Sequence, residues 1–543
     1  MVGVSAIEPS HSDMRLTLAF AALALAAFPA LAADADGSRW WAHVETLAGP
    51  QFEGRMTGTA GYDRAADYAA RAFAAYGLQP AGTEGYLQPM TFTEQTVLAD
   101  RSSAALVAGG EVAPLEVVPL EVGPDLLFGA RIPQPEAIEA PLVFIGYGLH
   151  LPEVGYDDFA GQDLKGKIAV YVNGGPGDIA AELKSHSRGS ETWRAAQAAG
   201  AVGLISIANP KSMDVPWARQ VQNSNQPGMY PADAALNEVR EAKLSAAFNP
   251  AQAEKLFARS GHSFAEVLAL ADAARPIAGF DLAQSIRAQV ATRTRQVTSA
   301  NVVAKLPGRD PALAAEHVVV TAHLDHLGLN TSGAGPAYYP GALDNAAGAA
   351  SVLEIARDMA AAKARPRRSV LFVLLTGEEK GLLGSRHFAG RPSVPADSVV
   401  ADLNMDMALP LWTFDSVLMY GVDESTLGDT ARRVSKAAGL EVVADPYPDR
   451  NSFIRSDQYS FIRAGIPALA FKFGFKPGTP QAQIESAWRA SRYHALTDDL
   501  SQPVEKAQAA RFNVFLGKLI FAVADGRERP RWKETSFFKR FAK

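Results

Sequence analysis

The stretch VVVTAHLDH, residues 318–326, places a run of β-branched apolar residues directly before two histidines and an aspartate. Such a run predicts a buried strand, and His323 stands where that strand ends. Three further apolar runs, at 370–375, 399–403 and 466–473, precede Glu378 and Glu379, Asp406, and the loop that carries His494. Strands that alternate with helical stretches predict a doubly wound α/β domain for the chain beyond about residue 299.

The polar residues after these strands form one candidate site. In an open α/β sheet, side chains beyond the carboxyl ends of the strands meet in one crevice, so these residues are expected to converge. Each of them alone has a simpler interpretation. Asp344 precedes the helical stretch 347–359 and suits an N-cap, and Glu378 and Glu379 suit a helix N-terminus. The combination of histidines and carboxylates is what indicates a metal site.

Composition narrows the chemistry. The 543 residues are 48% hydrophobic and 20% charged, which predicts a globular protein of about two or three domains. The net charge is -6, and the body of the chain has no run of basic residues with aromatic residues between them. Both observations argue against a nucleic-acid partner. The sequence contains no cysteine, which excludes disulfides, thiol nucleophiles and thiolate ligands. A metal must therefore bind to His, Asp and Glu.

The beginning of the sequence has the pattern of an export signal. Met14 and Arg15 precede an apolar run over residues 16–28, and residues 30–32 read Ala-Leu-Ala, the small-x-small pattern of a cleavage site. We expect a signal peptide over 1–32, with Met14 as an alternative start, and a periplasmic or extracellular mature protein. An uncleaved anchor is disfavoured because the run is shorter than the roughly 20 residues of a membrane span. No transmembrane segment is expected in the mature chain.

Five motifs together carry a family resemblance: AHLDH at 322–326, GALDNAAG at 341–348, TGEE at 376–379, LNMDM at 403–407, and YH at 493–494. Their order resembles that in the di-zinc aminopeptidases, the family of bacterial leucyl aminopeptidases and aminopeptidase Y, which is related to glutamate carboxypeptidase. The segment 47–82 is similar to the usual opening of that family. Residues 141 to about 210 look like a protease-associated domain.

This resemblance implies the zinc exopeptidase fold: an α/β unit with a mixed, mostly parallel sheet and helices on both faces, plus a β-rich protease-associated domain. The division it suggests is a signal peptide over 1–32, the N-terminal part of the catalytic domain over 33–130, an inserted domain over 131–295, a catalytic core over 296–526, and a basic aromatic tail over 527–543. We expect the tail to pack on the catalytic domain, with an anionic membrane surface as the alternative.

The resemblance also implies a set of two zinc ions and their ligands. His323 and Asp406 would bind one ion, Glu379 and His494 the other, and Asp344 would bridge both. Carboxylate and imidazole groups are the ligands expected for zinc in a protein without cysteine.

Three further residues receive catalytic roles from the resemblance. Glu378 would be the general base that takes a proton from the attacking water. Asp325 would accept a hydrogen bond from the second ring nitrogen of His323, and Tyr493 would support the oxyanion. His326 and His387 are expected to have surface or core roles instead of binding metal.

Two positions depart from the family pattern. Gln458 stands where relatives often have histidine, which puts substrate contacts near it in doubt. Residues 494–499 read HALTDD where His-Thr-Pro-x-Asp is more familiar, a change expected to alter the rim of the pocket.

The predicted function is zinc-dependent removal of N-terminal residues from peptides, and several alternatives stay open. A carboxypeptidase or dipeptidase of the same fold needs the same metals, with Arg450 or Arg455 as candidates to bind a terminal carboxylate. A glutaminyl cyclase with one zinc and a receptor-like binding module are further candidates. A serine hydrolase at Ser263 is disfavoured, because the second glycine of a nucleophile elbow is missing and the segment reads as a helix start. The sequence leaves side-chain preference and oligomeric state open.

Overall fold

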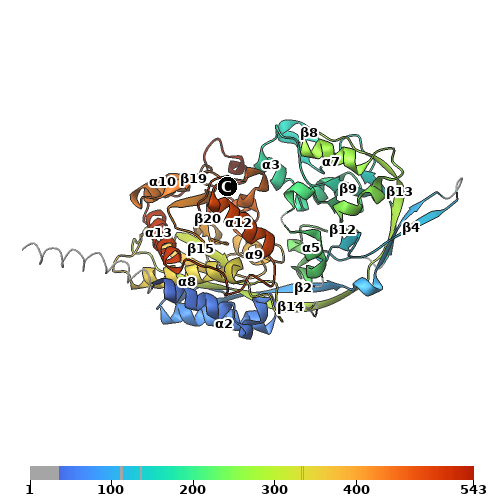
Figure 1. Cartoon of the computed structure of the whole chain (residues 1–543). Coiled ribbons are helices and arrows are strands. Elements are labelled where there is room, and N and C mark those ends of the chain that lie inside the picture. Colours follow the sequence, from blue (N-terminus) through green and yellow to red (C-terminus); the bar gives the residue numbers. More distant parts are fainter. Residues whose placement is uncertain are drawn as a thin grey trace, which may run out of the picture.

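The computed structural model describes residues 36–109, 114–134, 137–213, 215–224, 226–331, 333 and 335–542. The expected signal peptide, residues 1–32, lies outside the described residues. The described chain is organised around two large β-sheets, one of ten strands and one of eight (Figure 1).

The ten-stranded main sheet is mixed, as predicted. Its four central strands run parallel in the order β16 (Ser369–Leu375), β15 (His317–His323), β17 (Val399–Asn404) and β20 (Ala468–Phe473). On one flank lie the antiparallel strands β14 (Thr292–Leu306), β2 (Leu87–Val97) and β11 (Gly228–Pro231), with β1 (Gln79–Pro80) paired to β14. On the other flank, β18 (Ser416–Tyr420) is antiparallel to β20, and β19 (Glu441–Val443) follows it.

Helices cover both faces of this sheet, because successive residues of each buried strand point to opposite faces. Val318 and Val320 of β15 join the core beneath α2 (Ala60–Ala75), α8 (Ala347–Ala361) and α13 (Lys506–Ala524). Val319 faces the other way and joins a cluster with residues of α9 (Leu383–Gly390) and α11 (Gln458–Arg463). The near-continuous apolar runs that predicted these strands are thus explained by burial on two sides.

Helix α13 is the one helix among the described residues that is long and apolar enough to cross a membrane, judged by length and composition. Its mean hydropathy reaches 1.2. Phe512, Leu516 and Ile520 nevertheless point into the main core, where each is at most 1% exposed. The helix is therefore a core element of the main-sheet unit.

The eight-stranded second sheet is inserted between β2 and β14. Its order is β4 (Glu116–Leu120), β3 (Ser103–Ala108), β13 (Phe280–Gln289), β6 (Ala137–Phe144), β9 (Ile168–Val172), β10 (Gly203–Ile207), β12 (Leu244–Phe248) and β5 (Leu126–Phe128). Figure 1 shows the long strands β2 and β14 leading from the main sheet toward it. We call residues 103–289 the second-sheet region.

The expected division at residue 131 does not coincide with these sheets. Strands β3, β4 and β5 lie before residue 131 but pair in the second sheet, and β11 lies in the predicted insert but pairs with β2 of the main sheet. The pairing of β3 with β13 joins segments more than a hundred residues apart in sequence. Local sequence patterns carry no information about such a partner.

Further α-helices lie between and after these strands in the described chain. They are α3 (Ala181–His186), α4 (Ser190–Ala198), α5 (Trp217–Asn223), α6 (Glu254–Phe257), α7 (Phe264–Asp272), α10 (Thr426–Ala437) and α12 (Pro480–Ser491). Ser263 caps α7 in a reciprocal pair with Glu266, which confirms the helix start expected there.

The C-terminal tail packs on the main-sheet unit, as expected. Trp532 donates its indole N–H to the carbonyl of Gly465 at 3.0 Å. Phe538 is fully buried and contacts Phe453 with ring centroids 5.2 Å apart. The aromatic side chains of the tail therefore contribute to a core cluster.

Candidate metal centre

All five expected ligands lie together at the carboxyl ends of the parallel strands. His323 is the last residue of β15, and Asp406 follows the end of β17 by two residues. Glu379 lies in the turn after β16, Asp344 in the irregular turn before α8, and His494 after α12. Asp344 has non-helical φ and ψ angles, and the N-cap position of α8 is Ala346, so the helix-cap interpretation is wrong for Asp344.

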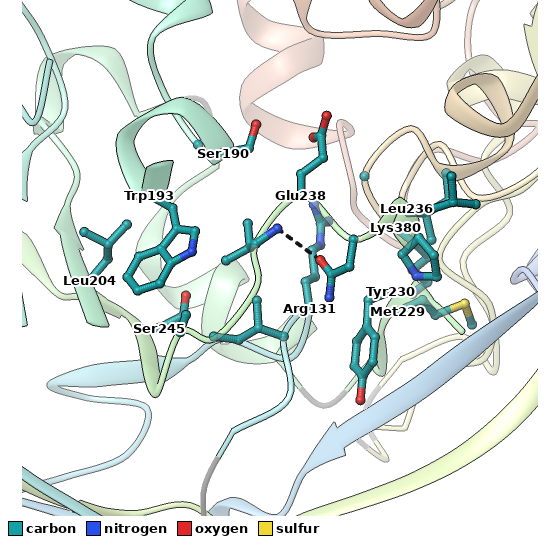
Figure 2. A pocket seen from close by; sticks show the side chains of 18 of the residues that line it. Arg131, Ser190, Trp193, Leu204, Met229, Tyr230, Leu236, Glu238, Ser245 and Lys380 are labelled. Carbon is teal, nitrogen blue, oxygen red and sulfur yellow. Dashed lines mark hydrogen bonds between the residues drawn. The ribbon is translucent and has the colours of Figure 1, made fainter. Parts of the chain in front are cut away.

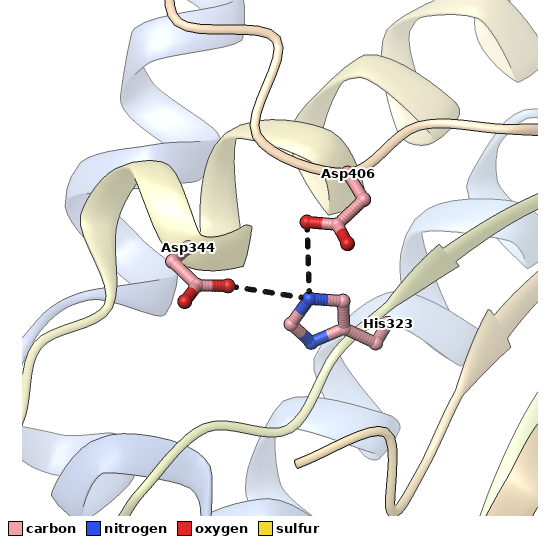
Figure 3. Close-up of side chains that lie close together, drawn as sticks. All are labelled: His323, Asp344 and Asp406. Atoms are coloured by element: carbon pink, nitrogen blue, oxygen red, sulfur yellow. Dashed lines mark ion pairs between the residues drawn. The ribbon is translucent and has the colours of Figure 1, made fainter. Parts of the chain in front are cut away.

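One half of the site consists of His323 and two aspartates. The Nε2 atom of His323 lies 3.3 Å from Asp344 Oδ1 and 3.5 Å from Asp406 Oδ1 (Figure 3). His323 and Asp344 are almost completely buried, and Asp406 is partly exposed.

The other half of the site uses the second oxygen of the same aspartate. His494 Nε2 lies 3.3 Å from Asp344 Oδ2 and 3.1 Å from Glu379 Oε2. The carboxylate of Asp344 therefore stands between two histidines, with one oxygen directed to each. This arrangement matches a carboxylate that bridges two cations.

The spacing of these atoms fits metal ligands better than hydrogen bonds. Two atoms bound at about 2.0–2.1 Å to a tetrahedral zinc lie roughly 3.3–3.4 Å from each other. The four distances between the histidine Nε2 atoms and the carboxylate oxygens of the site, two of them to Asp344, are 3.1–3.5 Å. In addition, Asp344 Oδ2 and Asp406 Oδ1 are buried and have no hydrogen-bond partner among the described residues. Buried polar atoms without a partner are rare unless a bound ion or water completes them, so the donor set fits a metal centre.

The electrostatics of the bare site show how strongly these groups are coupled. Burial disfavours the charge of His323, but the carboxylates of Asp344 and Asp406 outweigh it and hold its pKa well above the usual value. The pKa of His494 is raised in the same way, mainly by Glu379. Both histidines are therefore protonated at neutral pH when no metal is bound, and their charge is what offsets the carboxylates.

Glu378 lies next to the ligand Glu379 and is half-buried. Burial raises its pKa well above the usual value, and the charges of Glu379 and Asp457 add to the effect. Its backbone N–H donates to Asp325 Oδ1 at 3.1 Å. A carboxyl group with a raised pKa at the edge of a metal site is suited to proton transfer near neutral pH.

Asp325 lies at the site, but its carboxylate differs from the expected role. The ring atom Nδ1 of His323 is 3.1 Å from the backbone carbonyl of Asp325 and 4.0 Å from its carboxylate. The carboxylate instead accepts hydrogen bonds from the backbone N–H groups of Glu378 and Glu379 and from the Thr57 hydroxyl. The expected pairing is thus corrected: the carbonyl orients the histidine, and the carboxylate fixes the turn that carries the two glutamates.

His326 was expected to have a surface or core role, and the structure places it in the core beside a ligand. Its Nδ1 atom lies 2.8 Å from Glu379 Oε1, and its buried Nε2 atom has no hydrogen-bond partner in the part of the chain that the structure describes. His326, Asp344 and Glu379 form a group that could hold a metal ion by themselves. The motif AHLDH contained this signal, since His326 is three residues after His323.

Tyr493 and His494 stack, with ring centroids 4.0 Å apart and an interplanar angle of 28°. Burial raises the pKa of Tyr493 to about 12, so its hydroxyl is protonated at neutral pH and can donate a hydrogen bond. His494 has a φ of 53°, in the left-handed region, which costs a residue with a side chain about 1–2 kcal/mol. Contacts around this loop must offset that cost.

Gln458 is buried, and its side chain links two segments of the chain by hydrogen bonds. Its Oε1 atom accepts a hydrogen bond from Asn404 at 2.7 Å, and its Nε2 atom donates to the carbonyl of Phe453 at 2.8 Å. Neighbouring Asp457 is completely buried, and burial raises its pKa to about 7.

Asp498 and Arg55 hold the segment around Asp344, and neither role was expected from the sequence. Asp498 accepts hydrogen bonds from the backbone N–H groups of Leu343 (3.1 Å) and Asp344 (2.9 Å). Arg55 is completely buried and donates to four carbonyl groups, namely those of Leu47, Leu324, Pro340 and Gly341. Burial lowers the pKa of Arg55 to about 10, so it keeps its charge at neutral pH.

A cavity of about 290 Å³ lies between the second-sheet region and the turn after Glu379 (Figure 2). Trp193 and Tyr230 line one part of it, and Arg131, Glu238 and Lys380 supply charges. Arg131 also donates a hydrogen bond to the backbone carbonyl of Glu379 at 2.8 Å. The second-sheet region thus reaches the metal-binding turn directly.

The hydrogen bonds that Asp498 accepts from Leu343 and Asp344 can be tested by mutation. In an Asp498→Asn variant one carboxylate oxygen becomes an NH₂ group that faces an N–H donor, so the turn at Asp344 loses its preferred position. We expect metal affinity to fall about 10–100-fold, the usual effect of removing a group that orients a ligand. The measurement is zinc retained during dialysis against a graded chelator. Asp499→Asn, which changes the adjacent half-exposed residue, is the control; equal zinc retention in the two variants would contradict the assignment.

Comparison with known proteins agrees with this geometry. Residues 301–519 match Peptidase family M28. The chain is 33% identical over 124 residues to leucine aminopeptidase 1 of Trichophyton rubrum, which is 22% of this chain and 32% of that protein. It is 29% identical over 212 residues to leupeptin-inactivating enzyme 1 of Streptomyces exfoliatus, which is 38% of this chain and 44% of that protein. The chain thus spans less than half the length of these curated relatives.

Among solved structures, the chain resembles an aminopeptidase from Aneurinibacillus sp. strain AM-1 with a TM-score of 0.53 and 20% identity. The similarity covers 92% of this chain and 95% of that one, so it concerns the whole fold, including the second sheet. Residues 301–519, which contain all five candidate ligands, are the segment of the chain that matches peptidase family M28.

Proposed function

We propose that this protein is a metallo-aminopeptidase that holds two zinc ions and removes residues from the N-terminus of peptides. The observation that carries the proposal is the carboxylate of Asp344, whose two oxygens face His323 and His494 at 3.3 Å each. Glu378 lies directly beside this pair of sites. The names of the relatives support the choice of aminopeptidase, since two of them are leucine aminopeptidase 1 and an Aneurinibacillus aminopeptidase.

In this proposal His323 and Asp406 would hold one zinc, Glu379 and His494 would hold the other, and Asp344 would be a ligand of both. Bound zinc would polarise the scissile carbonyl group and make a bound water more acidic. Glu378 takes the proton of the attacking water and later delivers it to the leaving amine. His326 and the Asp325 carboxylate keep Glu379 in place while this happens.

The alternatives fit the described residues less well. A cyclase with one zinc would not use both halves of the site, and here each half has a histidine and its carboxylates in place. A binding module would not need Glu378 beside the ligands. For a carboxypeptidase, Arg450 is a poor carboxylate receptor, because its guanidinium lies over the Tyr447 ring and 3.5 Å from Glu485 Oε1.

The proposed function is tested with aminoacyl-p-nitroanilides and with dipeptides blocked at either end, assayed before and after chelation and zinc addition. An aminopeptidase cleaves substrates with a free amino group in a zinc-dependent manner and fails on N-blocked ones. Cleavage restricted to N-blocked peptides with a free carboxylate would make the protein a carboxypeptidase. No hydrolysis of any of them by zinc-loaded protein would reject a peptidase.

Glu378→Gln is the variant that isolates the proposed general base. Glutamine has nearly the same shape but cannot accept the proton, so kcat should fall by about 10²–10⁴. Because Glu378 is not a ligand in the proposal, the variant should retain as much zinc as the wild type, measured by elemental analysis. A variant that loses zinc together with activity would show that Glu378 binds metal.

Zinc binding should release protons, because both histidines are protonated in the metal-free site at neutral pH and must lose their protons to bind metal. Their raised pKa values set the sign: the apparent zinc affinity falls as the pH is lowered below them. The measurement is calorimetric titration of metal-free protein in two buffers with different ionisation enthalpies. Identical heats in the two buffers would contradict the ligand assignment of the histidines.

Tyr493 is proposed to donate its hydroxyl to the oxyanion that develops on the substrate carbonyl. Tyr493→Phe keeps the ring stacked on His494 but removes that donor. The expected result is a lower kcat, by about 10²-fold or more, with KM and zinc content nearly unchanged. An unchanged kcat would leave Tyr493 with the packing role that its contact with His494 already gives it.

We also propose that residues 1–32 direct export and are removed. The support is the apolar run followed by the Ala-Leu-Ala pattern at residues 30–32. N-terminal sequencing of protein recovered from the periplasm or medium should begin near Ala33. Recovery of only cytoplasmic, uncleaved chain would reject this.

A further inference from the structure

Side chains of the second-sheet region hold the backbone of the loop that carries His494. Arg219 in α5 donates to the carbonyl of Tyr493 at 2.8 Å and to the carbonyl of Ala490 at 2.7 Å. Asn223, one turn further along α5, donates to the carbonyl of His494 at 3.3 Å. Figure 1 shows α5 on the side of the second-sheet region that faces the main sheet.

The same region also holds the turn that carries Glu379. Arg131 donates to the backbone carbonyl of Glu379 at 2.8 Å. Lys380, the next residue, is buried and donates in the opposite direction, to the carbonyl of Pro227, at 2.9 Å. The turn is therefore tied to the second-sheet region from both sides.

These contacts fall on one half of the metal centre. Glu379 and His494, the two residues contacted, share one proposed zinc. The other proposed zinc is shared by His323, the last residue of β15, and Asp406, two residues after β17. His323 is oriented by the carbonyl of Asp325 within the main-sheet unit. The two halves of the site thus differ in what positions their ligands.

The His494 loop has a physical need for such support. His494 is the ligand with a left-handed backbone (φ 53°), and it follows the end of α12 at Ser491 instead of a strand. Hydrogen bonds from a guanidinium to the last carbonyl groups of a helix are favourable, because the helix C-terminus carries partial negative charge. Arg219 makes one such bond at Ala490 and fixes the loop two residues beyond the helix with the other.

We propose that Arg219, Asn223 and Arg131 are positioning residues for Glu379 and His494, so that the second-sheet region sets the affinity of one of the two metal sites. The inference rests on the proposed two-zinc function, but it concerns residues that lie outside the segment matching peptidase family M28. The region would therefore support one half of the metal centre.

The test measures zinc binding at both sites, without reference to catalysis. Metal-free full-length protein is titrated with zinc in competition with a chromophoric chelator, which gives two dissociation constants. Arg219→Ala and Arg219→Ala/Asn223→Ala should weaken one zinc by about 10–100-fold and leave the other within about twofold. Arg219→Lys, which retains a charge but not the two-pronged geometry, should fall between Arg219→Ala and the wild type.

Two controls separate positioning from general damage. Arg240→Ala removes hydrogen bonds of the same kind, from an arginine to the carbonyls of Asn237 and Ala235, but these lie within the second-sheet region. It should leave both zinc affinities unchanged. Asn223→Asp keeps an acceptor for the Tyr339 hydroxyl, but it replaces the donor to His494 with a negatively charged oxygen that repels the His494 carbonyl. Thermal unfolding of the metal-free forms should give similar Tm values for Arg219→Ala and Arg240→Ala.

The outcomes separate this inference from the proposed function. Unchanged affinities in the Arg219 variants, or equal weakening of both zinc ions, would overturn the positioning role while leaving the peptidase assignment in place. Selective loss of one zinc in a protein that cleaves no free-amine substrate would support the positioning role and reject the aminopeptidase. Wild-type protein that binds fewer than two zinc ions would overturn both.

Discussion

The central constraint on this structure is the gathering of four carboxyl groups at one edge of a sheet. Asp344, Glu379 and Asp406 lie around two histidine rings, and Glu378 stands beside them. Buried carboxylates repel one another and lose hydration, so they require nearby positive charge. The raised pKa values of His323 and His494 are one response to that requirement, and bound zinc would supply further positive charge.

The neighbouring hydrogen bonds follow from this constraint, because groups that repel one another must be held in place by the backbone. Asp498 holds the turn at Asp344, and the Asp325 carboxylate holds the turn at Glu379. Arg55 joins four loop carbonyls and adds a buried positive charge near the carboxylates. Arg55 lies in the N-terminal segment, and Asp325 and Asp498 lie in the segment that matches family M28. Arg131 and helix α5 add hydrogen bonds from the second-sheet region.

Much of the site could be predicted because its signals are local. Apolar runs mark the strands, ligand-type residues follow the strand ends, and a parallel arrangement brings strand ends together. Asp344 illustrates the limit of such local patterns. Its position before α8 is typical of a helix cap. The five motifs and the tertiary structure are needed to show that Asp344 instead faces two histidines. The contacts of His326 with Glu379 and of Asp498 with Asp344 were not predicted, because these partners lie 53 and 154 residues apart in sequence.

The sequence by itself determined the α/β class, the strands of the main sheet and the residue types available to a metal, because each follows from periodicity or from the absence of cysteine. Only the tertiary structure decided that β3, β4 and β5 belong to the second sheet and that β11 returns to the main one. It also decided that the Asp325 carbonyl orients His323, and that Arg219 and Asn223 reach the His494 loop. The strand pairings and the contacts of Arg219 and Asn223 join segments that are distant in sequence. The contact of His323 depends on whether the backbone carbonyl or the carboxylate of Asp325 lies nearer to its ring. They depend on where the chain places each group in space, which a local pattern does not record.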